Sequence, residues 1–430
     1  MNTPVSPFRR AAVLAVGSAG DVAPLAAVAA RLAARGLQTT LLAPQCYASL
    51  AGATDIAFTT IGADDTFADV FDGTDVWTAR HGLAASWRYY GAAMRSGYAA
   101  LRRGWTSDDT VLVSSSFAVA ARLAEECDGF VNTTVHLSPS LMFSRVRPPR
   151  WPARSIPPGW PQWLQEGLSA AAERWAIDPV IGAQVNPFLA ELGRPRRRRL
   201  FSQWIHSPRR VAYAFPQWLA PAASDWPAAG IYAGFPRRSG APRPLSGEVE
   251  AFLREGAGPA VVVTAGTAVA TRPAWVGRVV AFLLARGARV IVVEKDGAPL
   301  AASTSLLRVP FAPFESLLPR VHWVVHHGGI GTAAEALRAG IAQWLVPTSH
   351  DQPDNADRLQ RLGLAYTLTR DAEPQTLTRA WQWATEGTLR ASILNAAQCR
   401  VLEDGDGADR IAELAMPRVS SVTTGRFLRR

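Results

Sequence analysis

The sequence predicts an α/β protein made of two doubly wound, Rossmann-like domains that face each other across a cleft. A strand–helix–strand pattern near the N-terminus recurs in the second half of the chain, and 430 residues exceed what one ordinary hydrophobic core accommodates. Two such domains place a ligand between the carboxyl ends of their sheets.

The first unit starts with an apolar strand at 11–16. A turn at 17–21 leads into an amphipathic helix at 22–35, which Gly36 can end, and a second strand follows at 37–43. A strand, a crossover helix and a second strand of this length predict parallel pairing with a right-handed connection.

The second unit repeats this order. A strand at 260–264 and a turn at 265–267 precede a helix at 273–286, and the next strand covers 289–293. Between the two units, PRRSGAPRPLSG (236–247) is rich in proline and glycine and has no apolar periodicity, as in a linker. The predicted divisions are an N-terminal domain, the linker, a C-terminal domain and a basic tail, at 1–235, 236–247, 248–416 and 417–430.

Charge and cysteine content limit the function classes. The net charge of +10 is carried by arginine, since Lys295 is the single lysine, and either codon bias or attraction to anions accounts for it. No nucleic-acid-binding motif accompanies the charge, so we expect no nucleic-acid partner. Cys46, Cys127 and Cys399 form neither a disulfide framework nor a metal-ligand spacing, which favours a reducing cytoplasm.

The chain has no apolar stretch near the roughly 18 residues that span a bilayer. The short apolar run after Arg9 and Arg10 is a buried strand rather than a signal peptide. The stretch from 145 to 230 is rich in tryptophan and arginine, which fits a core, a hydrophobic acceptor pocket or a membrane-facing surface. We therefore expect a cytoplasmic protein, with peripheral contact at the inner face of the membrane left open.

Residues 323–355 carry the strongest functional signal. An apolar run at 323–325 ends in two histidines and a glycine-rich turn, and a helix at 332–339 follows, closed by Gly340. A helix N-terminus after such a turn binds phosphate, because unpaired backbone N–H groups and the helix dipole point at it. A nicotinamide site is excluded, since the turns after both first strands lack the three-glycine spacing.

Individual side chains in this segment suit the parts of a nucleotide sugar. The turn around a diphosphate would use His327, Gly328, Gly329, Gly331 and Thr332. Glu335 would be repelled by the phosphates, so the ribose hydroxyls suit it better. Asp351, Gln352 and Asn355 offer the donors and acceptors that a sugar ring needs.

The order of these residues resembles the nucleotide-sugar signature of the family 1 glycosyltransferases. The resemblance implies the GT-B fold, inversion at the anomeric carbon and no metal or other cofactor. It also implies that His327, Gly329, Gly331 and Thr332 bind the diphosphate, Glu335 the ribose, and Asp351 with Gln352 the donor sugar. Phe311 corresponds to a residue that stacks on the base, and Thr267 to a second phosphate contact.

In GSAGDVAPL, Asp21 matches the family's general base. Such a base accepts the proton of the acceptor hydroxyl as its oxygen attacks the anomeric carbon. Capping of the helix that starts at Val22 is the competing role. His81 and His136 are weaker candidates with structural roles, and His326 is a buried histidine at a strand end.

A narrower resemblance extends over nearly the whole chain. GSAGDVAPL, the FSQWIHSP run at 201–208, HGGIG and HDQPDNADRL resemble bacterial rhamnosyltransferases that form monorhamnolipids. The chain departs from these rhamnosyltransferases at two places. The loop 264–267 lacks the glutamine that is expected there, and His136 stands where a less basic residue is expected.

The sequence therefore predicts an inverting glycosyltransferase that moves L-rhamnose from dTDP-L-rhamnose to a 3-(3-hydroxyalkanoyloxy)alkanoate. The expected partners are this small-molecule donor and an apolar, lipid-like acceptor. One alternative is a UDP-glucose-dependent enzyme that acts on a sterol, polyketide or phenolic. The other is a non-catalytic nucleotide-binding partner protein.

Overall fold

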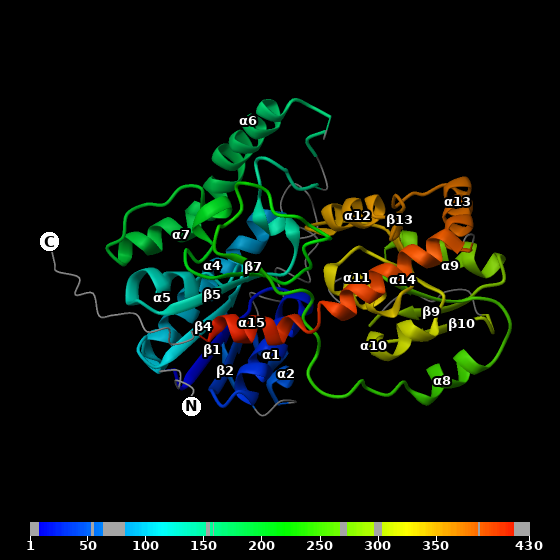
Figure 1. Cartoon of the computed structure of the whole chain (residues 1–430), viewed down its shortest axis with the longest axis horizontal. Coiled ribbons are helices and arrows are strands. Elements are labelled where there is room, and N and C mark those ends of the chain that lie inside the picture. The colour runs from blue at the N-terminus through cyan, green and yellow to red at the C-terminus, as the bar shows by residue number, and fades with distance from the viewer. Residues whose placement is uncertain are drawn as a thin grey trace.

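The computed structural model describes residues 8–52, 56–62, 82–151, 155–157, 159–266, 273–295, 303–385 and 388–416. Its two halves each contain one parallel sheet, and they lie side by side along the long axis of the molecule (Figure 1). Within the described residues, no helix is both long and apolar enough to cross a membrane.

The first sheet has seven strands in the order β3-β2-β1-β4-β5-β6-β7, all parallel. The strands are β1 (Arg10–Leu14), β2 (Gln38–Ala43), β3 (Ala57–Thr60), β4 (Thr110–Ser115), β5 (Val131–His136), β6 (Val211–Tyr213) and β7 (Gly230–Tyr232). Its helices are α1 (Ala19–Ala34), α2 (Ala48–Gly52), α4 (Gly82–Gly104), α5 (Ala120–Asp128), α6 (Gln162–Ala172) and α7 (Asp178–Glu191). Short helical turns are η1 (Gln45–Tyr47), η3 (Pro139–Met142) and the π-helical η4 (Glu173–Ile177) and η5 (Leu200–Trp204).

The second sheet has six parallel strands in the order β10-β9-β8-β11-β12-β13. The strands are β8 (Ala260–Thr264), β9 (Arg289–Val293), β10 (Leu306–Val309), β11 (Trp323–His326), β12 (Ala342–Leu345) and β13 (Ala365–Thr367). The helices that follow the linker are α8 (Gly247–Arg254), α9 (Ala274–Ala285), α10 (Phe314–Leu317), η6 (Leu318–Arg320), α11 (Ile330–Ala339), α12 (Gln352–Arg361), α13 (Pro374–Thr385), α14 (Thr388–Glu403) and α15 (Gly407–Ala415).

Both sheets are doubly wound, which confirms the predicted fold class. Every residue of β4 and of β8 is buried, because helices cover both faces of these central strands. The strand order reverses between β1 and β4 in one sheet and between β8 and β11 in the other. Ligands of such folds bind at the carboxyl ends of the strands beside these reversals. The turn before Asp21 and the turn after His326 both lie there.

The predicted elements agree with the observed ones apart from their ends. The largest difference is α1, which starts at Ala19 instead of residue 22, because Ser18 provides the helix cap three residues earlier than expected. Asp21 is thus in the first turn of the helix rather than in front of it.

The domain boundaries remain a prediction. The last helix, α15, packs against the first half of the chain although it follows the second half in sequence. Helix α15 falls within the predicted C-terminal domain of 248–416, yet it packs beside α1 in the first half (Figure 1). Ala408, Ile411 and Ala412 are buried in the core of the first sheet, and Asp406 pairs with Arg31 at 2.8 Å. The end of the chain therefore joins the two halves.

Candidate functional site

The turn after β11 is shaped by a buried neutral histidine. His326 Nε2 is 3.0 Å from Gln343 Oε1, and His326 Nδ1 accepts the backbone N–H of Gly328 at 3.2 Å. One ring nitrogen therefore donates and the other accepts, which is the pattern of a neutral imidazole. Burial and the neighbouring His327 lower the pKa of His326 to about 3. The expectation of a buried strand-end histidine is confirmed.

Two glycines enclose the imidazole of His327. A Cβ atom on Gly266 would lie 2.6 Å from His327 Cε1, and one on Gly329 would lie 2.5 Å from His327 Nε2. Any side chain at either glycine would therefore displace the ring. Burial lowers the pKa of His327 to about 4, so the ring is neutral, and its buried Nδ1 has no hydrogen-bond partner among the described residues. Because no described residue bonds to this nitrogen, it is available to a ligand group at the start of α11.

Helix α11 begins beside this ring. Gly329 is its N-cap and supplies no capping side chain, and the first intrahelical bond runs from the Ala333 N–H to the Gly329 carbonyl. The N–H groups of the first helical turn, which includes Gly331 and Thr332, therefore have no partner within the helix. With the dipole behind them, they form a site for an anion.

Glu335 is already paired in this structure. Its Oε1 lies 2.6 Å from Arg338 Nη1, and Arg338 also donates to the carbonyls of Phe235 and Pro236 at 3.1 and 3.0 Å. Burial raises the pKa of Glu335. The position predicted to bind ribose is thus tied to the start of the predicted linker.

Phe311 is 56% exposed, as a base-stacking ring must be before the nucleotide binds. The guanidinium of Arg243, a linker residue, lies 4.7 Å from the centre of the Phe311 ring, and Arg243 Nε is 3.1 Å from Glu315 Oε1. This cation–π contact was not predicted from the sequence, because the linker has no recognisable pattern.

Asp351 and Gln352 lie at the start of α12. The side-chain oxygen of Gln352 already accepts hydrogen bonds from the loop before the helix. The Gln352 Oε1 accepts the Thr348 N–H, the Thr348 hydroxyl and the Ser349 N–H, at 2.8, 2.9 and 3.1 Å. Its oxygen is therefore used to close the preceding loop, and only its Nε2 hydrogens can reach a sugar. Burial raises the pKa of Asp351.

Asn355 connects both parts of this donor region to the first half of the chain. Its Nδ2 donates to the Gly328 carbonyl at 3.0 Å and to Asp351 Oδ2 at 2.8 Å, and its Oδ1 accepts the Ser138 hydroxyl at 3.2 Å. Asn355 is 1% exposed. The sequence suggested a sugar contact for it, but its polar atoms already have partners.

Asp21 lies where the two halves meet. Its Oδ2 accepts the Ser18 N–H at 2.8 Å and the Ser18 hydroxyl at 2.9 Å, which completes a reciprocal capping box. Burial raises the pKa of Asp21 to about 6; the Ser18 bonds oppose this, and the charge of Asp351 adds to it. A carboxylate with a raised pKa is a better proton acceptor, so capping and base catalysis are compatible.

Asp21 is bordered by aromatic side chains. Its charge adds to the effect of burial in raising the pKa of Tyr90, and the Tyr90 ring stacks on Phe117 with ring centres 4.9 Å apart. Phe117 in turn stacks on Phe201 at 6.0 Å. A row of three stacked aromatic rings thus starts near the candidate base.

His136 and His206 form a buried chain on the same side. Nε2 of His206 donates to the Ser202 carbonyl at 3.1 Å, so His206 Nδ1 accepts from His136 Nε2 at 2.9 Å. His136 Nδ1 then accepts the Ser116 hydroxyl at 2.9 Å. Burial lowers the pKa of His206 to about 4, and burial with the neighbouring His206 holds the pKa of His136 well below its usual value. Both rings are neutral and hold the end of β5 in place.

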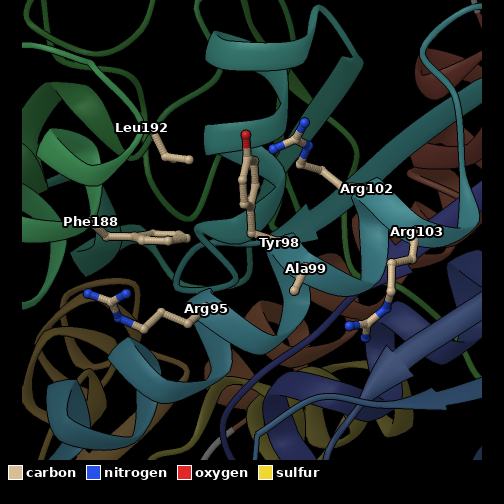
Figure 2. Close-up of a pocket in the computed structure, with 7 residues that line it drawn as sticks. All are labelled: Arg95, Tyr98, Ala99, Arg102, Arg103, Phe188 and Leu192. Carbon is tan, nitrogen blue, oxygen red and sulfur yellow. The ribbon is translucent and has the colours of Figure 1, made fainter.

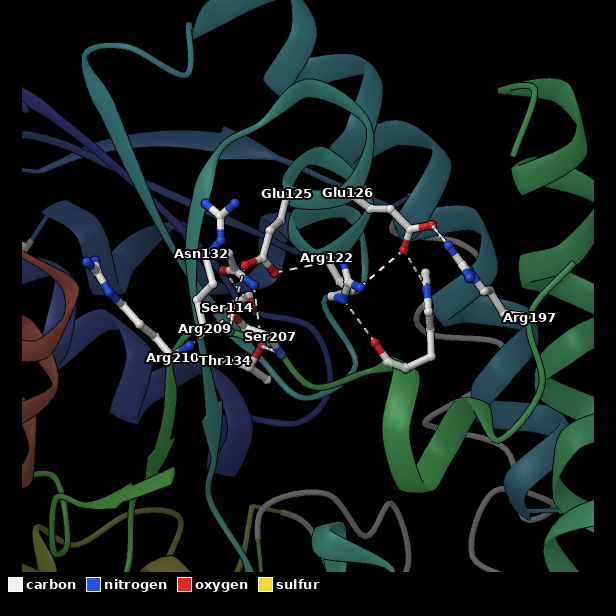
Figure 3. Close-up of polar contacts among 11 residues, drawn as sticks. Ser114, Arg122, Glu125, Glu126, Asn132, Thr134, Arg197, Ser207, Arg209 and Arg210 are labelled. Carbon is white, nitrogen blue, oxygen red and sulfur yellow. Dashed lines mark hydrogen bonds and ion pairs between the residues drawn. The ribbon is translucent and has the colours of Figure 1, made fainter. Parts of the chain in front are cut away.

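The FSQWIHSP run at 201–208 has a structural role. Figure 3 shows Ser207, from this run, beside Glu125 of α5. The Trp204 indole N–H donates to Glu126 at 2.9 Å, and the Ser207 hydroxyl donates to Glu125 at 2.8 Å. The run therefore fastens η5 to α5.

Two predicted residues, Thr267 and His81, lie outside the described residues. Among the described residues, no group of three or more His, Cys, Asp or Glu side chains could hold a metal ion. A separate hollow of about 460 Å³ lies between α4 and α7 (Figure 2). It is lined by Arg95, Tyr98, Ala99, Arg102, Arg103, Phe188 and Leu192. Arg95 is paired there with Glu191 at 2.7 Å, and none of the lining residues is one of the predicted site residues.

Comparison with known proteins agrees with the geometry of the site. Residues 283–406 match the family described as "Erythromycin biosynthesis protein CIII-like, C-terminal domain". O-mycaminosyltylonolide 6-deoxyallosyltransferase of Streptomyces fradiae is 29% identical over 94% of this chain and 96% of its own length. The chain is a glycosyltransferase.

Other matches place this glycosyltransferase among natural-product enzymes. Vancomycin aglycone glucosyltransferase of Amycolatopsis orientalis is 34% identical over 34% of this chain and 39% of its own length. The solved glycosyltransferase of kitacinnamycin has a TM-score of 0.72 at 18% identity and covers 95% of this chain and all of its own. Streptomyces sp. SF2575 glycosyltransferase SsfS6, solved with thymidine diphosphate, has a TM-score of 0.62 at 18% identity, with 95% and 99% covered.

These matches confirm the GT-B fold and support a family 1 glycosyltransferase with a nucleotide-sugar donor. They favour an enzyme over the alternative of a non-catalytic partner protein. They do not include a rhamnolipid-forming enzyme, so the narrower resemblance of the sequence stays a prediction.

Proposed function

We propose that the enzyme transfers a 6-deoxyhexose, L-rhamnose, from dTDP-L-rhamnose to the hydroxyl of an apolar acceptor. The observation that carries the donor half is the partnerless Nδ1 of His327 beside the open N-terminus of α11. A thymidine diphosphate in SsfS6 and a 6-deoxyallosyl group in the name of the Streptomyces fradiae relative favour a dTDP-deoxysugar donor.

Each part of the proposed donor contacts a different segment of the second half of the chain. The diphosphate contacts the α11 turn and the loop after β8, the ribose contacts α11, the base contacts the segment before α10, and the sugar contacts the start of α12. The proposed diphosphate contacts are His327, Gly329, Gly331, Thr332 and Thr267. Glu335 is the proposed ribose contact and Phe311 the proposed base contact. Asp351 and Gln352 are the proposed contacts of the donor sugar. For Glu335 to bind ribose, it must share its carboxylate between the ribose hydroxyls and Arg338.

In the proposed reaction, Asp21 accepts the proton of the acceptor hydroxyl. The acceptor oxygen forms a bond to the anomeric carbon as the bond from that carbon to the β-phosphate oxygen breaks. The electron pair of the broken bond leaves with dTDP, and the configuration inverts. The α11 N–H groups and His327 stabilise the charge on the departing diphosphate, so the mechanism needs no metal.

For the acceptor we propose a 3-(3-hydroxyalkanoyloxy)alkanoate, which would give a monorhamnolipid. The row of aromatic rings that starts at Tyr90, near Asp21, supports an apolar acceptor. The same aromatic rings also suit a flat polyketide, sterol or phenolic. The glucosyl group in the name of the vancomycin relative favours a glucose donor, and we keep UDP-glucose with such an acceptor as the second candidate.

Mass spectrometry of products separates the two candidates. The purified enzyme is given dTDP-L-rhamnose or UDP-glucose, each with the hydroxyalkanoyloxy acid or a phenolic polyketide. The proposal predicts a rhamnosylated hydroxy acid. Turnover with UDP-glucose and none with dTDP-L-rhamnose would contradict the proposed donor, and rhamnosylation of the polyketide alone would contradict the proposed acceptor.

A further inference from the structure

Helix α6 presents its apolar side chains to water. Trp163 is 73% exposed and Leu168 is also exposed, and Trp160 just before the helix is exposed as well. Trp175, in the π-helical turn η4 that continues α6, is 72% exposed. These four residues, the α6 apolar face, repeat at spacings that bring them to one side of a helix.

The opposite side of the same helix is polar and buried. The Ser169 hydroxyl bonds to the Gln165 carbonyl at 2.8 Å, and Glu173 accepts from Arg145 at 2.6 Å and from the Ser202 N–H at 2.9 Å. Both Ser169 and Glu173 are buried. A surface helix of a water-soluble domain has the reverse arrangement. Of the described residues of α6, none belongs to a hydrophobic core cluster.

The position of α6 leaves this face accessible. The helix projects at the edge of the first half, away from both sheets (Figure 1). Exposed apolar surface that is this concentrated marks a contact with another molecule or a membrane.

Charge next to the α6 apolar face indicates what covers it. The Arg199 N–H donates to Asp178 Oδ2 at 2.7 Å, so the basic run 196–199 ends beside the first turn of α7, three residues after Trp175. The rest of the run lies further along α7, where the Arg197 N–H donates to Asn186 at 2.8 Å. Arg174, Arg196 and Arg198 are exposed and form no ion pair among the described residues. Tryptophan with arginine is the combination that binds the interface of an anionic bilayer, where indole rings lie at the headgroup level. Two copies of a chain with a net charge of +10 would instead repel each other.

We propose that the α6 apolar face is a docking surface for an anionic lipid bilayer. Trp160, Trp163, Leu168 and Trp175 enter the interfacial layer, while the neighbouring arginines contact anionic headgroups. This inference is independent of the proposed donor and acceptor, because bilayer binding is measured without turnover.

Co-sedimentation with vesicles tests the proposal. The full chain is mixed with phosphatidylcholine vesicles or with mixed phosphatidylcholine and phosphatidylglycerol vesicles. We expect wild type to bind the mixed vesicles, and Trp163→Ser with Trp175→Ser to lower the partition coefficient about tenfold or more. Arg196→Ser with Arg198→Ser should remove the preference for phosphatidylglycerol. The matched control is Leu402→Ser, an exposed apolar residue on α14, which should bind as wild type does.

Since all substituted side chains are exposed, circular dichroism and dTDP affinity should stay unchanged in every variant. Absence of wild-type binding, or equal binding of the double tryptophan variant, overturns the proposal. So does a wild-type dimer that the tryptophan substitutions convert to a monomer without any vesicle binding, because the face then belongs to a second copy.

Discussion

Replacement of Asn355 by alanine removes three hydrogen bonds that join the sugar and diphosphate regions to each other and to Ser138 in the first half of the chain. The bonds lead to Gly328, Asp351 and Ser138, and the residue is buried. At about 1 kcal/mol net for each bond, the loss is about 3 kcal/mol, and the bond to the Asp351 carboxylate lies at the upper end of the range. If the bonds position the donor in the transition state, kcat/KM falls by about a hundredfold, which corresponds to about 2.7 kcal/mol.

Two further variants separate positioning from stability. Ser138→Ala removes the bond to Asn355 together with the Ser138 contact to the Ser140 hydroxyl, and leaves the Asn355 bonds to Gly328 and Asp351 in place. The lost bond to Asn355 should cost about 1 kcal/mol, or roughly fivefold in kcat/KM. Asn355→Asp keeps the acceptor for Ser138 but places a second carboxylate against Asp351. Like charges disfavour ionisation, so dTDP affinity of this variant should be poor near about pH 8 and improve towards about pH 5, where one carboxyl is protonated and can donate.

The assay is steady-state kinetics with donor and acceptor varied separately, together with dTDP titration calorimetry and thermal melting. We expect Asn355→Ala to lower kcat at temperatures where the variant is fully folded. A lower melting temperature with unchanged kcat and KM would refute the reasoning and leave Asn355 with a purely structural role.

Three other predictions follow from the site. Gly266→Ala should weaken dTDP binding by about tenfold in calorimetry, because the φ of +92° at Gly266 and the close contact with the His327 ring both oppose a side chain. An unchanged affinity would show that the His327 ring is free to move. Because the pKa of His327 is lowered to about 4, its protonation should not affect dTDP affinity between about pH 6 and pH 8, and a step in that range removed by His327→Gln would contradict a neutral ring. The pKa of Asp21 is raised from 3.8 to about 6, so its contribution to stability is present below pH 3.8 and lost as the pH rises through 6. Asp21→Asn should therefore have a higher melting temperature than wild type above about pH 7. Equal melting temperatures would contradict the burial of a charged carboxylate.

Local patterns in the sequence were sufficient to predict the first two strands of each sheet and the donor turn with the strand before it. Apolar periodicity and glycine positions located β8, β9 and α11 within a few residues, since each depends on contacts close in sequence. The same holds for Gly340, which ends α11 in the left-handed conformation as predicted.

Contacts between distant residues were out of reach. Ser138 and Asn355 are 217 residues apart, and His136 and His206 are 70 apart, so only the folded chain brings them together. The pairing of Glu335 with Arg338 could have been suspected from its i, i+3 spacing on a helix. The outward direction of Trp163 and Trp175 could not, because tryptophan is more often buried.

The central claim is that Asp21 is the catalytic base beside a nucleotide-sugar site built on α11. Asp21→Asn keeps the size of the side chain and an oxygen that can accept from Ser18, so the fold and dTDP affinity should be preserved. Single-turnover measurement of glycosyl transfer with saturating donor should then show a rate at least about a hundredfold below wild type. A variant that binds dTDP normally and transfers the sugar at the wild-type rate would contradict the claim.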